Sequence, residues 1–298
     1  EALDAIGDRR ALIGFSGGVD STTIAAALAP ALGDRLVAVC IDGGNLREGE
    51  VDEIQRHAKA AGVSLEVISC CDEFCAEFGD TTDAAEKRLR FRDVYKRVLE
   101  QAARRHNTDV IVQGTLAPDR IESGSAGASG QIKLHHNVDL GVAFEVHPFA
   151  DLFKYEVRAL GKVLELPESV TRREPFPGPG LFIRVLDQPI TEAVLDLVRW
   201  ADGVVRSILS GEGHDGYSQL VVACPGGPRM VGVKGDARVY EPPVIVRAIE
   251  TVDFMTGRGH VFPPRIKKQI ERALTAHDRI SRVLWDESDK PPATTEFE

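Results

Sequence analysis

Short apolar runs alternate with longer amphipathic stretches through the first half of the chain. The apolar runs have the length of buried strands, whereas the stretches between them place apolar residues at helical spacing. We therefore predict strands at residues 10–15, 36–41, 65–69 and 109–113, and helices at residues 21–32, 50–61, 84–105 and 154–164. This order predicts an α/β fold with a doubly wound parallel sheet, in which ligands usually bind beyond the carboxyl ends of the strands.

The pattern changes twice further along the chain. Residues 116–137 are rich in Gly, Ser, Ala and polar residues without any period, which is typical of a long loop that is either a lid or disordered. The Pro/Gly segment 174–181 cannot continue a helix or a strand. We predict a first domain over residues 1–185 and a smaller α+β domain over residues 186–298. The second domain is predicted to contain helices at residues 191–209 and 264–277 and strands at residues 219–223, 230–233 and 244–249.

Composition narrows the class of protein. The chain has 298 residues, of which 43% are hydrophobic, which is enough for two folded domains with a core each. The formal net charge of −10 argues against a broad nucleic-acid-binding surface, because such surfaces need clustered Lys and Arg. No apolar run reaches the roughly 20 residues of a membrane-spanning helix, and no secretory leader opens the sequence. We therefore expect a cytoplasmic protein that binds neither nucleic acid nor membrane.

The cysteines are not spaced along the sequence in the pairs that are typical of metal ligands. Their number is odd, which suits a reducing compartment: Cys40, Cys70, Cys71, Cys75 and Cys224. Ordinary core and surface thiols are the simpler interpretation. A metal or redox cluster of Cys70, Cys71 and Cys75 is the alternative, although the other ligands of a zinc site are not evident nearby.

A glycine-rich segment lies between the first predicted strand and the first predicted helix, where backbone amides and the helix dipole favour an anion. It consists of Ser16, Gly17, Gly18, Val19, Asp20 and Ser21. The glycines permit a ligand to approach the backbone closely, and the serine hydroxyls add hydrogen-bond donors. Asp20 is a candidate ligand for a Mg²⁺ ion that is also bound by phosphate oxygens. The segment lacks the Gly-Lys-Ser/Thr ending of a Walker motif, so it does not predict the usual γ-phosphate cradle.

Two other interpretations of this segment stay open. A glycine-rich turn can simply begin a helix. Residues 14–18 also satisfy G-x-S-x-G, the nucleophile elbow of α/β-hydrolases, which would make Ser16 a covalent nucleophile. The hydrolase elbow follows several earlier strands, however, whereas this segment follows the first one.

The SGGVDS segment resembles the loop of the ATP pyrophosphatases. In those enzymes the loop binds the pyrophosphate end of ATP while the bond at the α-phosphorus is broken. Longer motifs, in family order and extending to the last residue, resemble GMP synthetase. They are QGTLAPDRIES at 113–123, IKLHHN at 132–137, REPFPGPGL at 173–181, GDARVY at 235–240 and KPPATTEFE at 290–298. The resemblance implies an adenine nucleotide α-hydrolase-like first domain, followed by a domain that mediates homodimerisation and contributes to the acceptor-nucleotide site.

The resemblance also implies a reaction in two steps. The 2-oxygen of XMP attacks the α-phosphorus of MgATP to give an adenylylated nucleotide and pyrophosphate, and ammonia then displaces AMP to give GMP. In such transfers the protein mainly positions the reacting groups and neutralises the charge on the phosphates. Lys133 is the expected catalytic cation, which a closing lid brings over the phosphates, with Asp20 as metal ligand. His135 and His136 are candidates for lid closure or proton transfer, or are merely solvated loop histidines.

Further site residues follow from the same motifs. Asp42 follows the second predicted strand, and Gly114 belongs to the QGT motif. Both residues are expected beside ATP. The alternative for Asp42 is a turn that merely ends the strand. The resemblance assigns the acceptor nucleotide to a larger set in which Arg and Lys meet its phosphate. That set is Asp119, Glu122, Arg173, Lys290, Thr294 and Glu296. Solvated lid carboxylates and a disordered tail are the alternatives for its acidic and C-terminal members.

Several positions depart from the family pattern where substrate recognition is expected. They are Thr295, Phe297, His147 and the segments 87–92 and 256–259, and the span from 137 to 148 is shorter than usual. A ligase that amidates another purine-like nucleotide is therefore an alternative, and a non-catalytic nucleotide sensor is a third hypothesis. A thiolating enzyme is disfavoured, because neither an RNA-binding module nor a sulfur-carrying cysteine pair is evident. Ammonia is expected from solution, from a separate glutaminase subunit, or from a domain outside this sequence.

Overall fold

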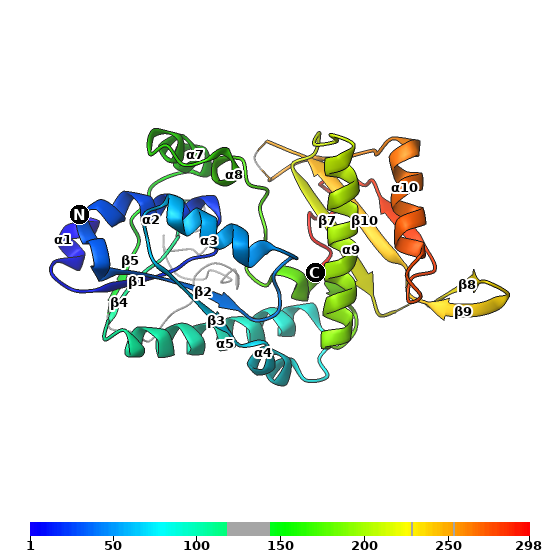
Figure 1. The fold of residues 1–298 in the computed structure, drawn as a ribbon, viewed down its shortest axis with the longest axis horizontal. Helices are drawn as coiled ribbons and strands as arrows, with labels where there is room; N and C mark the ends of the chain where they lie inside the picture. Colours follow the sequence, from blue (N-terminus) through cyan, green and yellow to red (C-terminus); the bar gives the residue numbers. More distant parts are fainter. Residues whose placement is uncertain (118–143, 228, 253) are drawn as a thin grey trace. The chain divides into compact units, whose positions relative to one another are not determined.

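The computed structural model describes residues 1–117, 144–227, 229–252 and 254–298. It forms two compact units (Figure 1). Unit 1 comprises Glu1–Gly43, Gly49–Phe74 and Leu89–Gly178, and unit 2 comprises Gly44–Glu48, Cys75–Arg88 and Pro179–Glu298. Within the described residues, no helix is both long enough and apolar enough to cross a membrane.

Unit 1 is built on a five-stranded parallel sheet in the order β3-β2-β1-β4-β5. The strands are β1 Ala11–Gly14, β2 Leu36–Asp42, β3 Leu65–Ser69, β4 Val110–Val112 and β5 Phe144–Val146. The central strand β1 is apolar and buried, as expected for a strand that is covered on both faces. Because all five strands are parallel, their carboxyl ends meet at one edge of the sheet, where a doubly wound fold binds its ligands.

Helices cover both faces of this sheet (Figure 1). The helices with residues in unit 1 are α1 Ala2–Ile6, α2 Val19–Leu32, α3 Glu50–Ala60, α4 Cys71–Phe78, α5 Ala84–Arg105, α7 Lys154–Val163 and α8 Glu168–Thr171, with a short 3-10 turn η1 Gly33–Arg35. The end of α4 and the beginning of α5 belong to unit 2. Helix α2 packs against α3, α7 and α8. Its buried residues include Ile24, Ala25 and Leu28, and α5 buries Val94 and Val98 at helical spacing. These contacts fix α2 relative to α3, α7 and α8.

Unit 2 contains a mixed sheet in the order β11-β10-β7-β6, with β12 beside β10. Its strands are β6 Val185–Leu186, β7 Gln219–Pro225, β10 Val244–Glu250, β11 Arg258–Gly259 and β12 Val283–Asp286, and the separate hairpin is β8 Met230–Lys234 with β9 Ala237–Glu241. The helical elements are η2 Gly180–Arg184, α9 Glu192–Gly211 and α10 Pro264–Thr275. Helix α9 packs on β7 and α10, and it buries Leu195, Val198, Ala201, Val205 and Leu209. That stripe recurs every three or four residues, as an amphipathic helix requires.

The predicted fold class is confirmed: unit 1 is a parallel α/β unit, and unit 2 is a smaller α+β unit. The long periodic elements occur close to the predicted bounds. Other elements were not predicted, namely α1, α4, α8, β5, β6, β9, β11 and β12. Most of these are short: β12 has only four residues, and β9 contains the charged Arg238 and Glu241 within five residues, so neither gives a clear strand pattern. The predicted division at residue 185 and the role of the second domain in dimerisation stay predictions.

Candidate active site

The SGGVDS loop lies between β1 and α2, at the carboxyl edge of the parallel sheet. Its entry is fixed by the hydrogen bond from the amide of Phe15 to the carbonyl oxygen of Val39, at 2.7 Å. Helix α2 begins after Gly18, and no side chain caps its N-terminus among the residues that the structure describes. A helix end without a side-chain cap leaves amide donors for an anion, and the dipole favours negative charge at the same place. The loop can therefore accept phosphate oxygens.

Gly17 is a position where the backbone itself demands glycine. Its φ is +67°, in the left-handed region that favours glycine. A Cβ added here would lie 2.8 Å from Arg173 Nη1 and 2.9 Å from Ile54 Cγ1. Any side chain at residue 17 would thus be strained and would also collide with its neighbours.

Asp20 lies in the first turn of α2. Its Oδ2 forms an ion pair with Lys154 Nζ, which comes from the beginning of α7. Its Oδ1 is buried and has no hydrogen-bond partner among the described residues. A Cβ added at Gly114 would be 4.0 Å from Asp20 Cβ, so the QGT motif passes beside this carboxylate. A carboxylate oxygen without a hydrogen-bond partner, next to a phosphate-binding loop, is a suitable ligand for a hard cation such as Mg²⁺.

Two serine hydroxyls complete the loop. Ser16 Oγ lies 3.3 Å from Ser21 Oγ and accepts a hydrogen bond of 3.3 Å from the amide of Gly18. Among the described residues, these contacts of Ser16 involve no histidine. The described residues therefore offer no base that would activate Ser16 as the serine of a nucleophile elbow. The exposed Ser16 is better suited to donate a hydrogen bond to an oxygen of a bound ligand.

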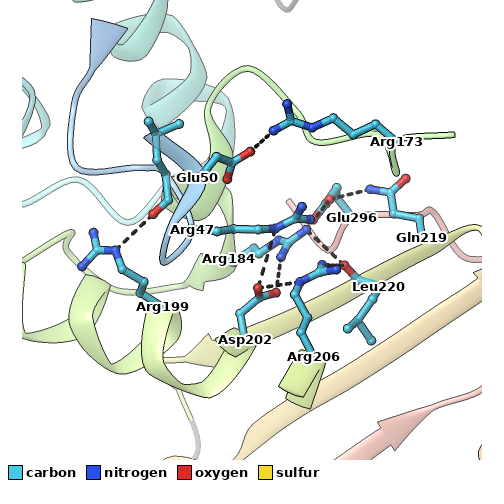
Figure 2. Close-up of polar contacts among 11 residues, drawn as sticks. Arg47, Glu50, Arg173, Arg184, Arg199, Asp202, Arg206, Gln219, Leu220 and Glu296 are labelled. Carbon is cyan, nitrogen blue, oxygen red and sulfur yellow. Dashed lines mark hydrogen bonds and ion pairs between the residues drawn. The ribbon is translucent and has the colours of Figure 1, made fainter. Parts of the chain in front are cut away.

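The carbonyl oxygen of Gly17 is the centre of a second cluster. Arg173 Nη1 donates a hydrogen bond to it at 2.6 Å, and His57 Nδ1 lies 2.8 Å from it. The other nitrogen of Arg173, Nη2, pairs with Glu50 Oε1 (Figure 2). His57 Nε2 lies 3.0 Å from Ser169 Oγ of α8. Burial lowers the pKa of His57, and the neighbouring Arg173 acts in the same direction against the opposing hydrogen bond to Gly17.

Asp42 lies at the carboxyl end of β2, next to β1 and opposite Ser69 of β3. It therefore shares the sheet edge with the SGGVDS loop, and its place beside ATP stays a prediction. Its carbonyl oxygen accepts a hydrogen bond of 2.9 Å from the amide of Cys70.

The cysteines show no sign of a reactive cluster. Burial raises the pKa of Cys40, Cys70 and Cys224 to about 12, so these thiols are protonated at neutral pH. Within the residues that the structure describes, no group of three His, Cys, Asp or Glu side chains is arranged to hold a metal ion. The described part of the chain therefore offers no support for a metal cluster of Cys70, Cys71 and Cys75.

Unit 2 contains a buried carboxylate surrounded by arginines (Figure 2). Asp202 Oδ1 pairs with Arg184 at 2.9 Å, and its Oδ2 lies 2.7 Å from Arg206 Nε and 3.6 Å from Arg47 Nε. Burial alone would raise the pKa of Asp202, but Arg206, Arg184 and Arg47 outweigh it, and the pKa is lowered. This cluster joins η2, α9 and the segment that contains Arg47.

The C-terminal tail docks on the same cluster. Glu296 Oε1 accepts hydrogen bonds from Arg184, at 3.3 Å, and from Gln219, at 2.9 Å (Figure 2). Its Oε2 is buried without a hydrogen-bond partner among the described residues. Glu298 Oε2 lies 3.0 Å from Lys87 Nζ, and a main-chain oxygen of Glu298 accepts a hydrogen bond from Arg88. The divergent Lys87 and Arg88 thus anchor the tail within unit 2.

Lys290 and Thr294 also belong to unit 2. Lys290 Nζ donates to the carbonyl of Phe254 at 2.6 Å and lies 3.2 Å from Thr295 Oγ1. It lines a cavity of about 760 Å³, together with Ser218, Glu250, Arg258 and other residues of unit 2. The Thr294 hydroxyl donates to the carbonyl of Glu296. The structure therefore joins Thr294 to Glu296 through the tail itself and places Lys290 at a cavity.

The sequence-predicted residues thus separate into three groups. Unit 1 brings together the SGGVDS loop, Asp42, Gly114 and Arg173, and unit 2 holds Lys290, Thr294 and Glu296. The remaining five lie outside the described residues: Lys133, His135, His136, Asp119 and Glu122. Sequence reasoning missed Lys154, Glu50 and His57, which contact the loop or its partner Arg173. Only their approach to the loop in space reveals them, since each lies far from it along the chain.

A parallel sheet with an SGGVDS loop before a helix without a side-chain cap is typical of the ATP pyrophosphatases. The family model described as NAD synthase matches residues 1–188, and the model described as GMP synthase C terminal domain matches residues 211–297. The chain belongs to the GMP synthase family, as its relatives show.

Two of these relatives are similar to it in length, and each is named as one subunit of a glutamine-hydrolyzing GMP synthase. The relative from Methanocaldococcus jannaschii is 39% identical, over 100% of this chain and 96% of the relative. The relative from Haloarcula marismortui is 40% identical with the same coverage, 100% and 96%. The glutamine-hydrolyzing GMP synthase of Streptomyces coelicolor is 39% identical over 98% of this chain, which spans 58% of that longer protein.

Proposed function

We propose that the chain converts XMP to GMP with the consumption of ATP, as a ligase of purine nucleotide biosynthesis. In the first step the 2-oxygen of XMP bonds to the α-phosphorus of ATP, and the bond to the leaving pyrophosphate breaks. In the second step the nitrogen of ammonia bonds to C2, the bond from C2 to the adenylyl oxygen breaks, and AMP leaves. XMP releases the proton of its lactam group to the solvent in the first step, and ammonia releases one proton as it becomes the 2-amino group. One XMP, one ATP and one ammonia give one GMP, one AMP and one pyrophosphate.

One observation carries this proposal: the SGGVDS loop presents a helix N-terminus without a side-chain cap, and the nearby buried Oδ1 of Asp20 has no hydrogen-bond partner in the described part of the chain. The amides suit the pyrophosphate end of ATP, and Asp20 suits Mg²⁺, which when bound supplies charge neutralisation at the phosphates. Lys154 pairs with Asp20 through Oδ2 and is thereby held where a phosphate would arrive. We infer that Lys154 joins Lys133 as a cation for the pyrophosphate group, while His135 and His136 stay candidates in the lid.

For the acceptor nucleotide, we propose residues of the C-terminal tail in unit 2. Glu296 Oε2 is a buried acceptor without a partner among the described residues, which suits an N–H or O–H donor of a nucleotide. Lys290 lies on a cavity of about 760 Å³ and is a cation for the acceptor phosphate. The Thr294 hydroxyl, which donates to the carbonyl of Glu296, supports the conformation of Glu296. Contacts of Asp119 and Glu122 with the acceptor stay predictions of the sequence resemblance.

The names of the two relatives of similar length support a further part of the proposal. Each is named as one subunit of a glutamine-hydrolyzing enzyme, which suggests that a separate glutaminase subunit supplies ammonia to this chain. We propose such a subunit as the physiological partner and retain ammonium from solution as the nitrogen source in vitro. A homodimer through unit 2 and a cytoplasmic location are also proposed, on the sequence resemblance alone.

The function is tested by supplying the purified chain with MgATP and ammonium, with XMP present or omitted. GMP identified by mass, in amounts equal to AMP and pyrophosphate and only with XMP, is the expected result. Amination of a different purine nucleotide in place of XMP would contradict the assigned acceptor. Binding of MgATP and XMP without any turnover would instead support a nucleotide sensor.

A further inference from the structure

The carbonyl oxygen of Gly17 receives two side-chain donors from different parts of unit 1. Arg173 Nη1 approaches it to 2.6 Å from the segment after α8, and His57 Nδ1 approaches it to 2.8 Å from α3. The two donor nitrogens are 3.4 Å apart. A carbonyl oxygen has two lone pairs, so this arrangement fills both of them with protein donors.

The chemistry of the carbonyl determines the proton position on His57. An oxygen of this kind only accepts, so Nδ1 must carry the proton, and the contact between Nδ1 and Arg173 Nη1 joins two donors rather than a donor and an acceptor. His57 is kept neutral by burial, which lowers its pKa. Its Nε2 therefore accepts a hydrogen bond from the Ser169 hydroxyl at 3.0 Å, and this bond fixes the tautomer and the ring orientation.

The charge of Arg173 is already matched within unit 1. Its Nη2 pairs with Glu50 Oε1, and the side chains of Arg173 and Glu50 are only 9% and 3% exposed. A buried guanidinium that is neutralised by a carboxylate and bonded to a backbone carbonyl is held by the protein. Its geometry suits the fixing of a loop better than the capture of a mobile phosphate.

The effect on the loop follows from the planarity of the peptide. In a trans peptide the carbonyl of Gly17 and the amide N–H of Gly18 point in opposite directions. A carbonyl that is held toward His57 and Arg173 therefore directs the Gly18 N–H to the other side of the loop. That N–H now contacts Ser16 Oγ at 3.3 Å, a long hydrogen bond that a phosphate oxygen can replace.

We propose that His57 and Arg173 are positioning residues that hold the Gly17 carbonyl and thereby direct the Gly18 amide toward the phosphates of ATP. The inference rests on the proposed use of this loop for ATP, but not on the identity of the acceptor. It assigns Arg173 to the loop, whereas the sequence resemblance assigned it to the acceptor phosphate. Glu50 and Ser169 orient the two donors.

A matched pair of substitutions at His57 tests the proposal. His57→Asn places an amide nitrogen near the position of Nδ1 and can still donate to Gly17, whereas His57→Gln places its amide near Nε2 and cannot. Arg173→Gln removes the second donor, and Arg172→Gln is its control, because Arg172 is exposed and pairs with the equally exposed Glu168. The dissociation constants of MgATP and of magnesium pyrophosphate are measured by calorimetry on the full chain without any acceptor, and KM for XMP is measured separately.

The expected order of affinities is specific. Affinity for both probes falls about 10- to 100-fold in Arg173→Gln and about 3- to 10-fold in His57→Gln, from the strengths of charged and neutral hydrogen bonds. It stays within about 2-fold of wild type in His57→Asn and Arg172→Gln. Equal losses in the two His57 variants would overturn the proposal, because they would show that only packing matters.

The Arg173 variant separates the two roles of that residue. Unchanged MgATP affinity together with a raised KM for XMP would overturn the inference and return Arg173 to the acceptor phosphate. If Arg173→Gln does not fold, the His57 pair still decides the question. Failure of the wild-type chain to bind either probe would instead contradict the proposed function itself.

Discussion

Both units contain a buried pair of arginine and carboxylate, but the two pairs are organised in opposite ways. In unit 2 the carboxylate is shared: Asp202 receives Arg184, Arg206 and Arg47 on its two oxygens (Figure 2). In unit 1 the arginine is shared: Arg173 divides its nitrogens between Glu50 and the carbonyl of Gly17. The first arrangement joins elements of the core, whereas the second connects the core to the backbone of a ligand-binding loop. Similar charges thus serve stability in one unit and loop position in the other.

The largest expected effect is on stability, in unit 2. Asp202→Ala leaves buried arginines without their carboxylate and should lower the free energy of unfolding by about 3–5 kcal/mol. Asp196→Ala is the matched control, because Asp196 is exposed on the same helix and should change stability by less than about 1 kcal/mol. Chemical denaturation of both variants measures the difference. Equal stabilities would show that the arginine cluster does not support the fold.

The pH dependence of the same variant sharpens the test. The pKa of Asp202 is lowered from its ordinary 3.8, so its stabilisation is present above that pH and is lost as the pH falls through the folded pKa. The wild type should therefore lose more stability than the variant on acidification below about pH 4. An unchanged slope would remove Asp202 from the acid-sensitive groups.

Asp20→Ala should have the next largest effect, on activity rather than on stability. Loss of the metal ligand should reduce turnover about 10²- to 10³-fold, which is the range for the loss of one preorganised electrostatic group. The matched control is Asp34→Ala, an exposed carboxylate of η1 beyond the other end of α2. Initial rates are measured while Mg²⁺ is varied. Normal activity of Asp20→Ala at limiting Mg²⁺ would exclude Asp20 as the ligand.

Lys133→Ala should reduce adenylylation severely, by about 10²-fold, and leave the fold intact, because Lys133 is predicted to lie in a lid loop and such a loop would support little core. Lys133→Arg keeps the charge and should recover part of the rate. Pyrophosphate release and a thermal melt are measured together. Unchanged pyrophosphate release in Lys133→Ala would reject an essential role for this residue.

Lys154→Met should have the smallest effect of the series. The ion pair between Lys154 and Asp20 is partly exposed, so its loss should cost less than about 1 kcal/mol of stability. Loss of a cation beside the phosphates should raise KM for MgATP about 10-fold. Lys162→Met, an exposed lysine of the same helix α7, is the control. Equal KM values in the two variants would separate Lys154 from ATP.

The sequence predicted the long periodic elements and the phosphate loop, because their signals are local. An apolar strand followed by SGGVDS and an amphipathic helix is readable within about 25 residues of sequence. The contacts of the Gly17 carbonyl are not local: His57 and Arg173 lie 40 and 156 residues from Gly17 along the chain. No period or motif connects such positions, and only the packing of α2 against α3 and α8 brings them together.

The arginine cluster around Asp202 in unit 2 could not be predicted from the sequence either. The tail motif marked Glu296 as a candidate, but a buried aspartate such as Asp202 within a helical pattern looks like a polar residue on the exposed face. Its burial depends on arginines from η2, from α9 itself and from the segment of Arg47, which the sequence does not place together. The family resemblance supplied the roles of Lys133, Lys290 and Thr294, and the roles of these residues stay predictions.

Transfer of an oxygen isotope tests the central claim most directly, namely that the SGGVDS loop supports attack at the α-phosphorus of ATP. XMP labelled with ¹⁸O at the 2-position is incubated with the chain, MgATP and ammonium, and the products are analysed by mass. The account predicts GMP without label and AMP that carries one ¹⁸O in its phosphate. Label in inorganic phosphate, together with formation of ADP, would contradict the account, because it would show attack at the γ-phosphorus.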